Sequence, residues 1–176
     1  MITFDHGNDA GTGTRLAVDI VPSNREDKGS VTMSVFPQDG PRDEEGRPHF
    51  SSTCKASVEI GVVGIAHVLS VLDGEERALR GGRGVIVRTG GDSHVLHIDK
   101  VLEPYAGFSL HVQNFLAGGG KSGGRIMLSL TEGAALSYAL KAAMGAVAFG
   151  CSQSQSNSRR TRTKSKSKTK SKENTK

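Results

Sequence analysis

The sequence predicts an α+β fold in which several β-strands are followed by a helix, and this order occurs twice. Over several short segments apolar and polar residues alternate with a period of two, as in strands with one buried face. Two other segments change to three- and four-residue apolar spacing, which is typical of helices. Turns that contain Gly or Pro separate the segments. Because no sequence motif recurs, the repetition lies in the architecture.

The first half of the chain contains three predicted strands and one short helix. The strands are residues 14–21, 29–36 and 50–60, and the helix is 61–72. The clearest strand pattern is the second, where Val31, Met33 and Val35 alternate with polar residues. An acidic, Pro-containing loop at 39–49 follows it. We expect these strands to form a sheet with one apolar face.

The second half of the chain repeats this order with more strands and a longer helix. The predicted strands are 83–89, 94–102, 107–114 and 124–130, and the helix is 131–150. Gly90-Gly91-Asp92 is typical of a hairpin turn, and residues 118–124 of a flexible hairpin loop. The last helix is rich in Ala and Leu, and Thr131 is a plausible N-cap.

Charge divides the chain into a body and a tail. The net charge is +5, but residues 151–176 hold nine basic residues and one acidic residue, a net charge of +8. The preceding 150 residues, with 14 basic and 17 acidic, therefore carry −3. The tail has almost nothing apolar to bury, so we expect it to be disordered. We predict a flexible N-terminus at 1–13, a folded domain at 14–150 and a basic Lys/Ser tail at 151–176.

Composition excludes several classes of protein. With 35% hydrophobic and only 5% aromatic residues, the core must be aliphatic. No apolar run reaches the roughly 20 residues that span a bilayer, and the N-terminus resembles neither a signal peptide nor a transit peptide. Two cysteines, Cys54 and Cys151, do not form a disulfide framework, so reduced thiols are expected.

Motifs of enzymes and metal sites are weak in this sequence. Gly120-Lys121-Ser122 resembles part of a phosphate-binding loop, but the leading glycine is absent and a strand follows instead of a helix. The formal Gly-x-Ser-x-Gly match at 120–124 also lacks a strand-to-helix turn. His94 and His97 face opposite sides of a predicted strand, and no Cys-x-x-Cys accompanies them. We predict no enzyme activity, metal, cofactor or small-molecule substrate.

The basic tail indicates contact with a polyanion. Its cationic side chains would neutralise phosphates and release counterions without sequence preference. The first six of them are Arg159, Arg160, Arg162, Lys164, Lys166 and Lys168. The arginine cluster is also typical of nuclear import signals, and a simple solubility tail is the alternative.

Six segments, in order and at matching spacing, resemble one known family. They are residues 13–22, 28–37, 55–61, 107–114, 128–134 and 146–150. The best local match is Gly107-Phe108-Ser109-Leu110-His111-Val112-Gln113-Asn114. From about Gly13 to Gly150 the chain resembles the Whirly family of single-stranded DNA-binding proteins. Gly13 replaces the first lysine of the family's opening motif, and only Arg15 keeps a charge there.

The resemblance implies a specific fold, assembly and binding mode. It implies two four-stranded antiparallel sheets packed with two helices, a homotetramer, and single-stranded DNA along the sheet edges between protomers. It implies a role in DNA maintenance or transcription regulation and a plastid or mitochondrial location. The candidate nucleic-acid-binding residues are Arg15, Lys28, Ser30, Lys55, Phe108, His111 and Asn114. Bases would stack on apolar side chains while polar and basic groups contact the backbone.

Two alternatives remain at the level of the sequence. RNA binding and annealing, as in kinetoplastid mitochondrial guide-RNA-binding proteins that share this fold, needs the same stacking and phosphate contacts. A structural or assembly protein tethered by its tail would place the binding function in residues 151–176 alone.

Overall fold

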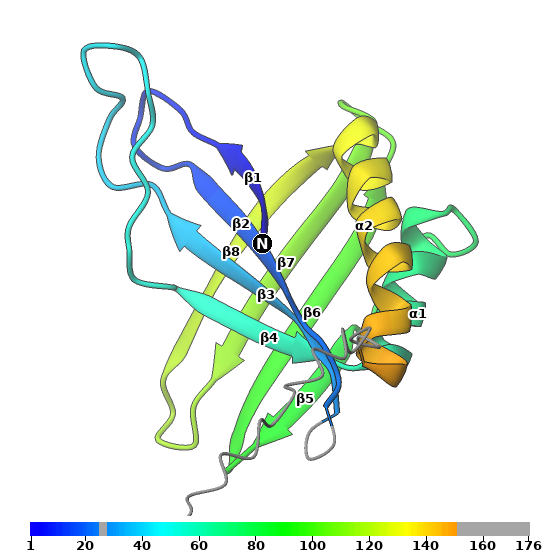
Figure 1. Cartoon of the computed structure of the whole chain (residues 1–176). Helices are drawn as coiled ribbons and strands as arrows, with labels where there is room; N and C mark the ends of the chain where they lie inside the picture. The colour runs from blue at the N-terminus through cyan, green and yellow to red at the C-terminus, as the bar shows by residue number, and fades with distance from the viewer. Residues whose placement is uncertain (25–27, 151–176) are drawn as a thin grey trace, which may run out of the picture.

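Residues 1–24 and 28–150, which the computed structural model describes, form two antiparallel sheets and two helices. The elements are β1 (Ile2–His6), β2 (Thr14–Val21), β3 (Ser30–Pro37), β4 (Ala56–Ile60), α1 (Val62–Leu72), β5 (Val85–Thr89), β6 (Asp92–Val101), β7 (Gly107–Phe115), β8 (Lys121–Ser129) and α2 (Leu130–Phe149). The strand orders are β1-β2-β3-β4 and β5-β6-β7-β8. Each sheet is a meander followed by a helix (Figure 1). The predicted fold of four strands and a helix, twice, is confirmed.

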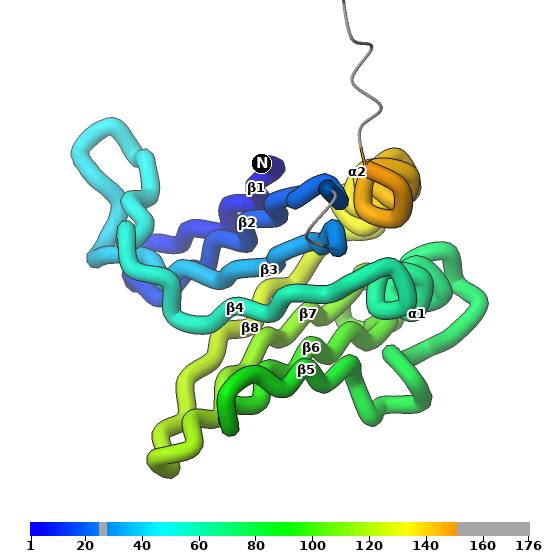
Figure 2. The backbone as a smooth tube through the Cα atoms, turned by 60° about the horizontal axis from the view of Figure 1, so that its bottom comes forward, coloured from blue at the N-terminus to red at the C-terminus, as the bar shows by residue number. Residues whose placement is uncertain are grey.

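The core lies between the two sheets and beneath the helices. Alternate side chains of each strand point inward, so Val18 of β2 lies opposite Met33 of β3 and both are fully buried. Leu110 and Val112 of β7 are buried from the other side. Both helices and the β1–β4 sheet lie on the same side of the β5–β8 sheet (Figure 2). Burial of aliphatic surface at about 25 cal/mol per Å² therefore stabilises this fold with few aromatic side chains.

The N-terminal residues 2–6 form the edge strand β1, and the expectation of a loose segment at 1–13 is wrong there. Phe4 pairs with Leu16 of β2 and is only 7% exposed. Thr3 and Asp5 alternate with Ile2 and Phe4, but two apolar positions are too few to separate a strand from a loop by pattern. The strand is stabilised instead by its pairing with β2, which a local sequence pattern does not reveal. The folded unit therefore begins before residue 14.

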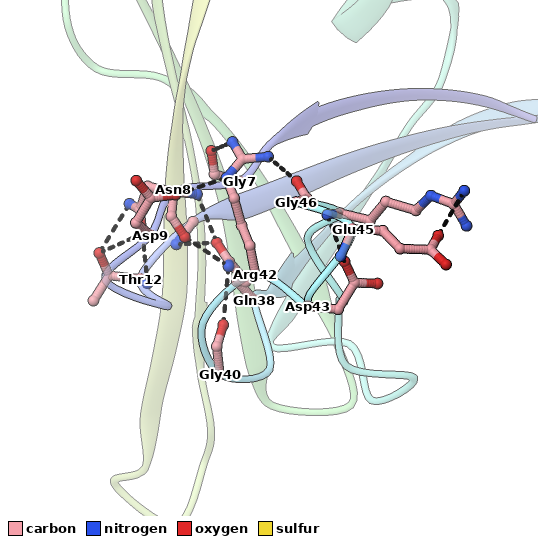
Figure 3. Close-up of polar contacts among 12 residues, drawn as sticks. Gly7, Asn8, Asp9, Thr12, Gln38, Gly40, Arg42, Asp43, Glu45 and Gly46 are labelled. Atoms are coloured by element: carbon pink, nitrogen blue, oxygen red, sulfur yellow. Dashed lines mark hydrogen bonds and ion pairs between the residues drawn. The ribbon is translucent and has the colours of Figure 1, made fainter.

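Gln38 and Arg42 hold the segment after β1 against the acidic loop that follows β3 (Figure 3). The buried Gln38 amide donates to the carbonyls of Asn8 (2.8 Å) and Gly40 (2.9 Å). Its Oε1 accepts from the backbone N–H groups of Asn8 (2.8 Å) and Gly13 (3.1 Å). The Arg42 guanidinium donates to the carbonyls of Gly7 (2.6 Å) and Gly46 (2.7 Å). Two segments distant in sequence are thereby joined.

Helix α2 begins with a capping box, and the N-cap is Ser129 rather than the predicted Thr131. Ser129 Oγ accepts from the Glu132 N–H (3.2 Å), and the Glu132 carboxylate accepts from the Ser129 N–H (2.8 Å). This reciprocal pair of hydrogen bonds satisfies two backbone donors at the start of the helix, which the hydroxyl of Thr131 alone would not do.

A side-chain hydrogen bond joins the two helices. The side chain of Asp73, at the end of α1, accepts from Ser137 Oγ (2.7 Å) in α2. No helix in the described part is both long and apolar enough to cross a bilayer.

In the second sheet, one hairpin turn is as predicted from the sequence and the other differs from the prediction. Gly90 and Gly91, with φ of 60° and 97°, form the predicted two-residue turn between β5 and β6. In the second hairpin, β8 already starts at Lys121, inside the predicted loop at 118–124. At Gly124 the strand passes so close to the other sheet that a Cβ would lie 2.9 Å from Val35, and this explains why a glycine occurs within the strand.

Candidate nucleic-acid interface

A groove follows the line where β4 and β5, each at the edge of its sheet, approach one another. It consists of two adjoining hollows of about 710 Å³ and about 450 Å³. They adjoin because Lys28, Gly29, Gly61 and Val87 border both. The last turn of α2 closes one end of the larger hollow through Val147. The groove is therefore built by both sheets and both helices.

The walls of the groove combine apolar surface with hydrogen-bonding groups. Val62, Val85 and Val87 supply aliphatic side chains to the larger hollow. The smaller hollow is more polar and is lined by Lys28, Ser30, Thr32, Ser57, Glu59, Thr89 and His94. Such a mixture suits a ligand with a flat apolar face and a charged backbone.

Ser30 lies in the wall of the smaller hollow with an unsatisfied hydroxyl. The residue is 5% exposed, and Oγ has no hydrogen-bond partner. Within residues 1–24 and 28–150 it is the one buried side-chain oxygen or nitrogen in this condition. Unpaired buried polar groups are costly and cluster at functional positions.

His94 and Asn114 form a polar pair between the sheets at the inner end of the smaller hollow. The hydrogen-bond network favours the orientation in which the Asn114 amide nitrogen donates to the Ser57 carbonyl (2.8 Å) and to His94 Nδ1 (3.1 Å). Nδ1 of His94 also lies 3.1 Å from the Ser57 carbonyl oxygen, so both sheets contact this side of the ring. Asn114 and the Ser57 carbonyl thus hold the imidazole of a groove histidine in place.

Comparison with solved structures identifies the fold. WHY1 from Arabidopsis thaliana superimposes with a TM-score of 0.57 at 15% identity, over 84% of this chain and 92% of that one. The chain has the Whirly fold. WHY3 from Arabidopsis thaliana matches with a TM-score of 0.57 at 12% identity, over 84% of this chain and 88% of that one. The plant transcriptional regulator PBF-2 matches with a TM-score of 0.54 at 15% identity, over 84% and 83%.

The resemblance predicted from the sequence is thus confirmed at the level of the Whirly fold. No protein-family model and no curated protein sequence matches the chain. At 12–15% identity, the shared sheets and helices are the common element. The Whirly fold in this chain is therefore maintained by the alternation of apolar residues more than by particular side chains.

The predicted binding residues are divided among five places in the Whirly fold. Lys28 and Ser30 line the groove, and Asn114 supports it through His94. Lys55 borders a separate hollow of about 230 Å³ between β3 and β8. His111 lies on the outward face of the second sheet, opposite Arg125 of β8. The structure brings together three of the seven candidates.

Phe108 and Arg15 are engaged within the domain. Phe108 is 3% exposed, and a Cβ on Gly133 of α2 would lie 2.3 Å from its ring, so the ring packs in the core. In this conformation Phe108, a candidate binding residue, therefore has no ring face available to a ligand. The Arg15 guanidinium donates twice to Asp5, each at 2.7 Å, and lies 4.5 Å from the centroid of Phe50. Its charge is neutralised locally, and the hydrogen bonds that it donates to Asp5 raise the pKa of Arg15.

The glycine at the start of β2 has a steric reason. A Cβ at Gly13 would lie 2.3 Å from Gln38 Oε1, so the buried amide network excludes a side chain there. The lysine that the family resemblance implies at this position therefore has no room beside Gln38.

The tail residues Arg159, Arg160, Arg162, Lys164, Lys166 and Lys168 lie outside the described residues. The predicted disorder and accessory role of residues 151–176 stay predictions. No group of three or more His, Cys, Asp or Glu side chains in residues 1–24 and 28–150 is arranged to hold a metal ion.

Sequence reasoning missed the groove residues contributed by β5 and its flanks. Val87 and Thr89 lie on the strand that faces β4, and Arg80 precedes it with a φ of 51°. The Arg- and Gly-rich run at 80–83 could have indicated this part of the site, because glycines permit the positive φ angles of a tight loop and the arginines add positive charge at the rim of the groove.

Proposed function

We propose that this protein binds nucleic acid, and specifically single-stranded DNA with little sequence preference, in DNA maintenance or transcription regulation. The observation that carries this proposal is the groove between the sheet edges β4 and β5, where aliphatic walls adjoin Lys28, Ser30 and the imidazole of His94. The Whirly fold, shared with a structure described as a plant transcriptional regulator, supports the same function.

The chemistry of the groove favours an unpaired strand. Bases in a single strand expose both faces, which pack against apolar side chains such as Val62 and Val87. The phosphates need cations and hydrogen-bond donors, which Lys28 and Arg80 provide at the rim. Apolar contact does not distinguish one base from another, so binding is expected to be sequence-tolerant.

The last described residues of α2 lie beside this groove. The Ala146 carbonyl in the last turn of α2 accepts from the Ser23 N–H (2.9 Å), and Ser23, Val147 and Ala148 line the larger hollow. The described residues therefore end at Gly150, two residues after the groove residue Ala148. Since residues 1–150 carry −3, the +8 tail supplies the general attraction and the groove supplies selection for a single strand.

Assembly into a homotetramer is part of the proposal. Helix α2 presents an exposed side made mainly of Ala, with Tyr138 74% and Phe149 90% exposed. Lys141 is the one charged residue on this side, and Asp73 neutralises it at 2.9 Å. An apolar helix face of this kind is suited to packing against the same helix in other copies.

Fluorescence anisotropy with full-length protein tests the function. The probes are a labelled oligothymidine of about 20 nucleotides, RNA of equivalent sequence, and duplex DNA, each titrated at several salt concentrations. We expect single-stranded DNA to bind most tightly. Lys28→Gln should weaken binding and lower the salt slope by about one. Arg47→Gln is the matched control, because Arg47 is ion-paired with Glu45 in the loop after β3.

A full-length variant with the nine basic tail residues replaced by Gln separates tail from domain. Retention of single-strand binding at low salt by this variant is the expected result. Complete loss of binding would favour a tail-tethered assembly protein instead. Equal affinity for duplex DNA would contradict the single-strand proposal, and tighter binding of RNA would favour the guide-RNA-binding alternative.

A further inference from the structure

A row of basic side chains crosses the outward face of the β5–β8 sheet. His97 of β6 pairs in register with His111 of β7, which pairs with Arg125 of β8. This face is the one opposite to the helices and the first sheet (Figure 2). Lys121 at the start of β8 and Arg88 of β5 are exposed on the same face. The register fixes the row because side chains alternate between the two sides of each strand.

The row is held in place by its neighbours. Arg125 Nε donates to Ser109 Oγ at 2.6 Å, and Ser109 is only 4% exposed. A Cβ at Gly84 would lie 2.9 Å from His97 Nδ1, so the absence of a side chain there makes room for the imidazole. The Arg125 guanidinium and the His97 ring are therefore positioned before any ligand arrives.

These cations differ from those of the first sheet in lacking carboxylate partners. In the first sheet and its loops, Arg15, Arg42 and Arg47 are paired with acidic residues at 3.0 Å or less. Among the described residues, no such ion pair is formed by Arg88, His97, His111, Lys121 or Arg125. Asp99, two residues after His97, is the one carboxylate of the described strands that shares this face.

Apolar groups accompany the charges. Phe115 is 39% exposed, and Lys121 Nζ lies 5.1 Å from the centroid of its ring. Ile86 (51%) and Met127 (39%) are also exposed on this face. An aromatic ring and a thioether beside unpaired cations are the groups that contact bases and phosphates of a single strand.

A continuous path leads from the groove to this face. Thr89 borders the smaller hollow of the groove and also a hollow of about 430 Å³ around the β5–β6 turn, which is lined by residues 88–93. Arg88 lines the second hollow and lies on the outward face. A strand that leaves the groove at Thr89 thus meets Arg88 next.

We propose that the outward face of the β5–β8 sheet is a second contact surface for a single nucleic-acid strand, in which His97, His111 and Arg125 bind phosphate and Phe115 packs on a base. This proposal rests on the proposed function for the class of its ligand. It adds a site, a route around the β5–β6 turn, and a dependence on strand length: a short strand fills the groove, and a longer one continues onto the face.

Protonation should strengthen this second contact. Partial burial lowers the pKa of His111, and the positive charges of His97, Arg125 and Lys121 lower it further. His111 therefore gains its proton at a lower pH than an ordinary histidine does, and a bound phosphate would favour the charged form. Asp99 on β6 and Arg88 on β5 are the other charged groups on this face, and no helix covers it. Affinity for a long strand should therefore rise as the pH falls.

The test compares full-length wild type with three variants, using labelled oligothymidines of about 10 and about 30 nucleotides at about pH 6 and about pH 8. The variants are the double substitution His97→Gln/His111→Gln, Arg125→Gln, and the control His49→Gln, whose ring binds Asp43 in the distant acidic loop. Wild type and the control should bind the long probe more tightly at low pH. The double variant should lose this gain, and Arg125→Gln should weaken long-probe binding about three- to tenfold at either pH.

Failures of the two proposals are distinguishable. If wild type binds neither probe, the proposed function fails. If wild type binds both probes but the double variant and Arg125→Gln match it in affinity, salt slope and pH dependence, only the second surface is contradicted. Thermal melting of each variant identifies any loss due to unfolding. Lys121→Gln, at an exposed position of the same face, provides an independent variant with the same expected weakening of long-probe binding.

Discussion

The imidazole of His6 lies 2.8 Å from the carboxylate of Glu132, and this contact joins the first strand to the first turn of the last helix. The other carboxylate oxygen of Glu132 accepts from the backbone and the hydroxyl of Ser129, both at 2.8 Å. One side chain therefore completes the capping box and holds β1. Burial alone would raise the pKa of Glu132, but the hydrogen bonds from His6 and Ser129 outweigh it and lower the pKa below its ordinary value.

Replacement of Glu132 by Gln should destabilise the protein. Glutamine has nearly the same size and shape as glutamate but no negative charge, so its hydrogen bonds with His6 and with the Ser129 N–H at the helix N-terminus are weaker. We therefore expect the free energy of unfolding to fall by about 1–2 kcal/mol. Urea denaturation measures the change. Glu75→Gln, at an exposed position in the loop between α1 and β5, is the control and should leave the midpoint unchanged. A midpoint for Glu132→Gln equal to that of wild type would contradict the assignment.

The stability of the protein should fall in acid through Asp73 and Glu132. Hydrogen bonds from Lys141 and Ser137 lower the pKa of Asp73 below its ordinary value, and the pKa of Glu132 is lowered as well. Groups with a lowered folded-state pKa stabilise the protein above the unfolded pKa, and this contribution is lost as pH falls through the folded pKa. The unfolding free energy should therefore decrease below about pH 4. Asp73→Asn should flatten this dependence, and a curve as steep as that of wild type would be evidence against it.

Two glycines of α2 should respond in opposite ways to alanine. At Gly133 a Cβ would lie 2.3 Å from the ring of Phe108, so Gly133→Ala should cost about 1–3 kcal/mol through overpacking. At Gly145 no atom lies within 4 Å and the position is exposed, so Gly145→Ala should stabilise the helix by about 0.5–1 kcal/mol. Thermal unfolding of both variants checks the pair. A stable Gly133→Ala variant would mean that Phe108 can leave the core and become available to a ligand.

The edge strand β1 should contribute to global stability. Phe4 is 7% exposed against Leu16, so Phe4→Ala should reduce the free energy of unfolding by about 3 kcal/mol. Thr3→Ala, on the opposite side of the same strand, should change it by less than about 0.5 kcal/mol. Equal, small effects at both positions would show that β1 detaches without unfolding the rest.

The exposed side of α2 should govern oligomeric state. Tyr138→Glu adds charge to a side that is mainly Ala, so it should convert the proposed tetramer to smaller species in light scattering coupled to size-exclusion chromatography. Arg47→Gln, in the distant acidic loop, is the control and should not alter the mass. A wild-type protein that is already monomeric would remove the assembly proposal and leave the groove to be tested separately.

Alternating residues predicted most of the strands because each has one buried side. The pattern Val31, Met33, Val35 determines β3 and its inward face without further information. It failed for β1, which has only two apolar positions, and for the start of β8, where the inward positions are Ser122 and Gly124 and carry no apolar side chain. In β7 the same alternation puts Phe108 on the buried side, together with Leu110 and Val112. Its assignment to a binding site came from family resemblance and contradicted that register.

The candidate site was less predictable because it is formed by parts distant in the chain. Val87 and Ser57 face one groove only because the edges of two separate sheets meet, and no local pattern encodes that meeting. Lys28 and Ser30 were identified through resemblance, whereas the support of His94 by Asn114 depends on pairing between β6 and β7. Sequence spacing indicates which face a residue occupies but not which other element lies opposite.

The uneven pairing of charges gives the domain an electric dipole. Residues 1–60 hold ten acidic and six basic residues, whereas residues 61–150 hold seven and eight. The arginines of the first sheet are largely neutralised by neighbouring carboxylates, and those of the second sheet are not. A polyanion approaching this molecule would experience a torque as well as a net force, because one end repels it and the other attracts it. The domain would therefore be turned before contact so that the second sheet meets the strand first, even though its overall charge is negative.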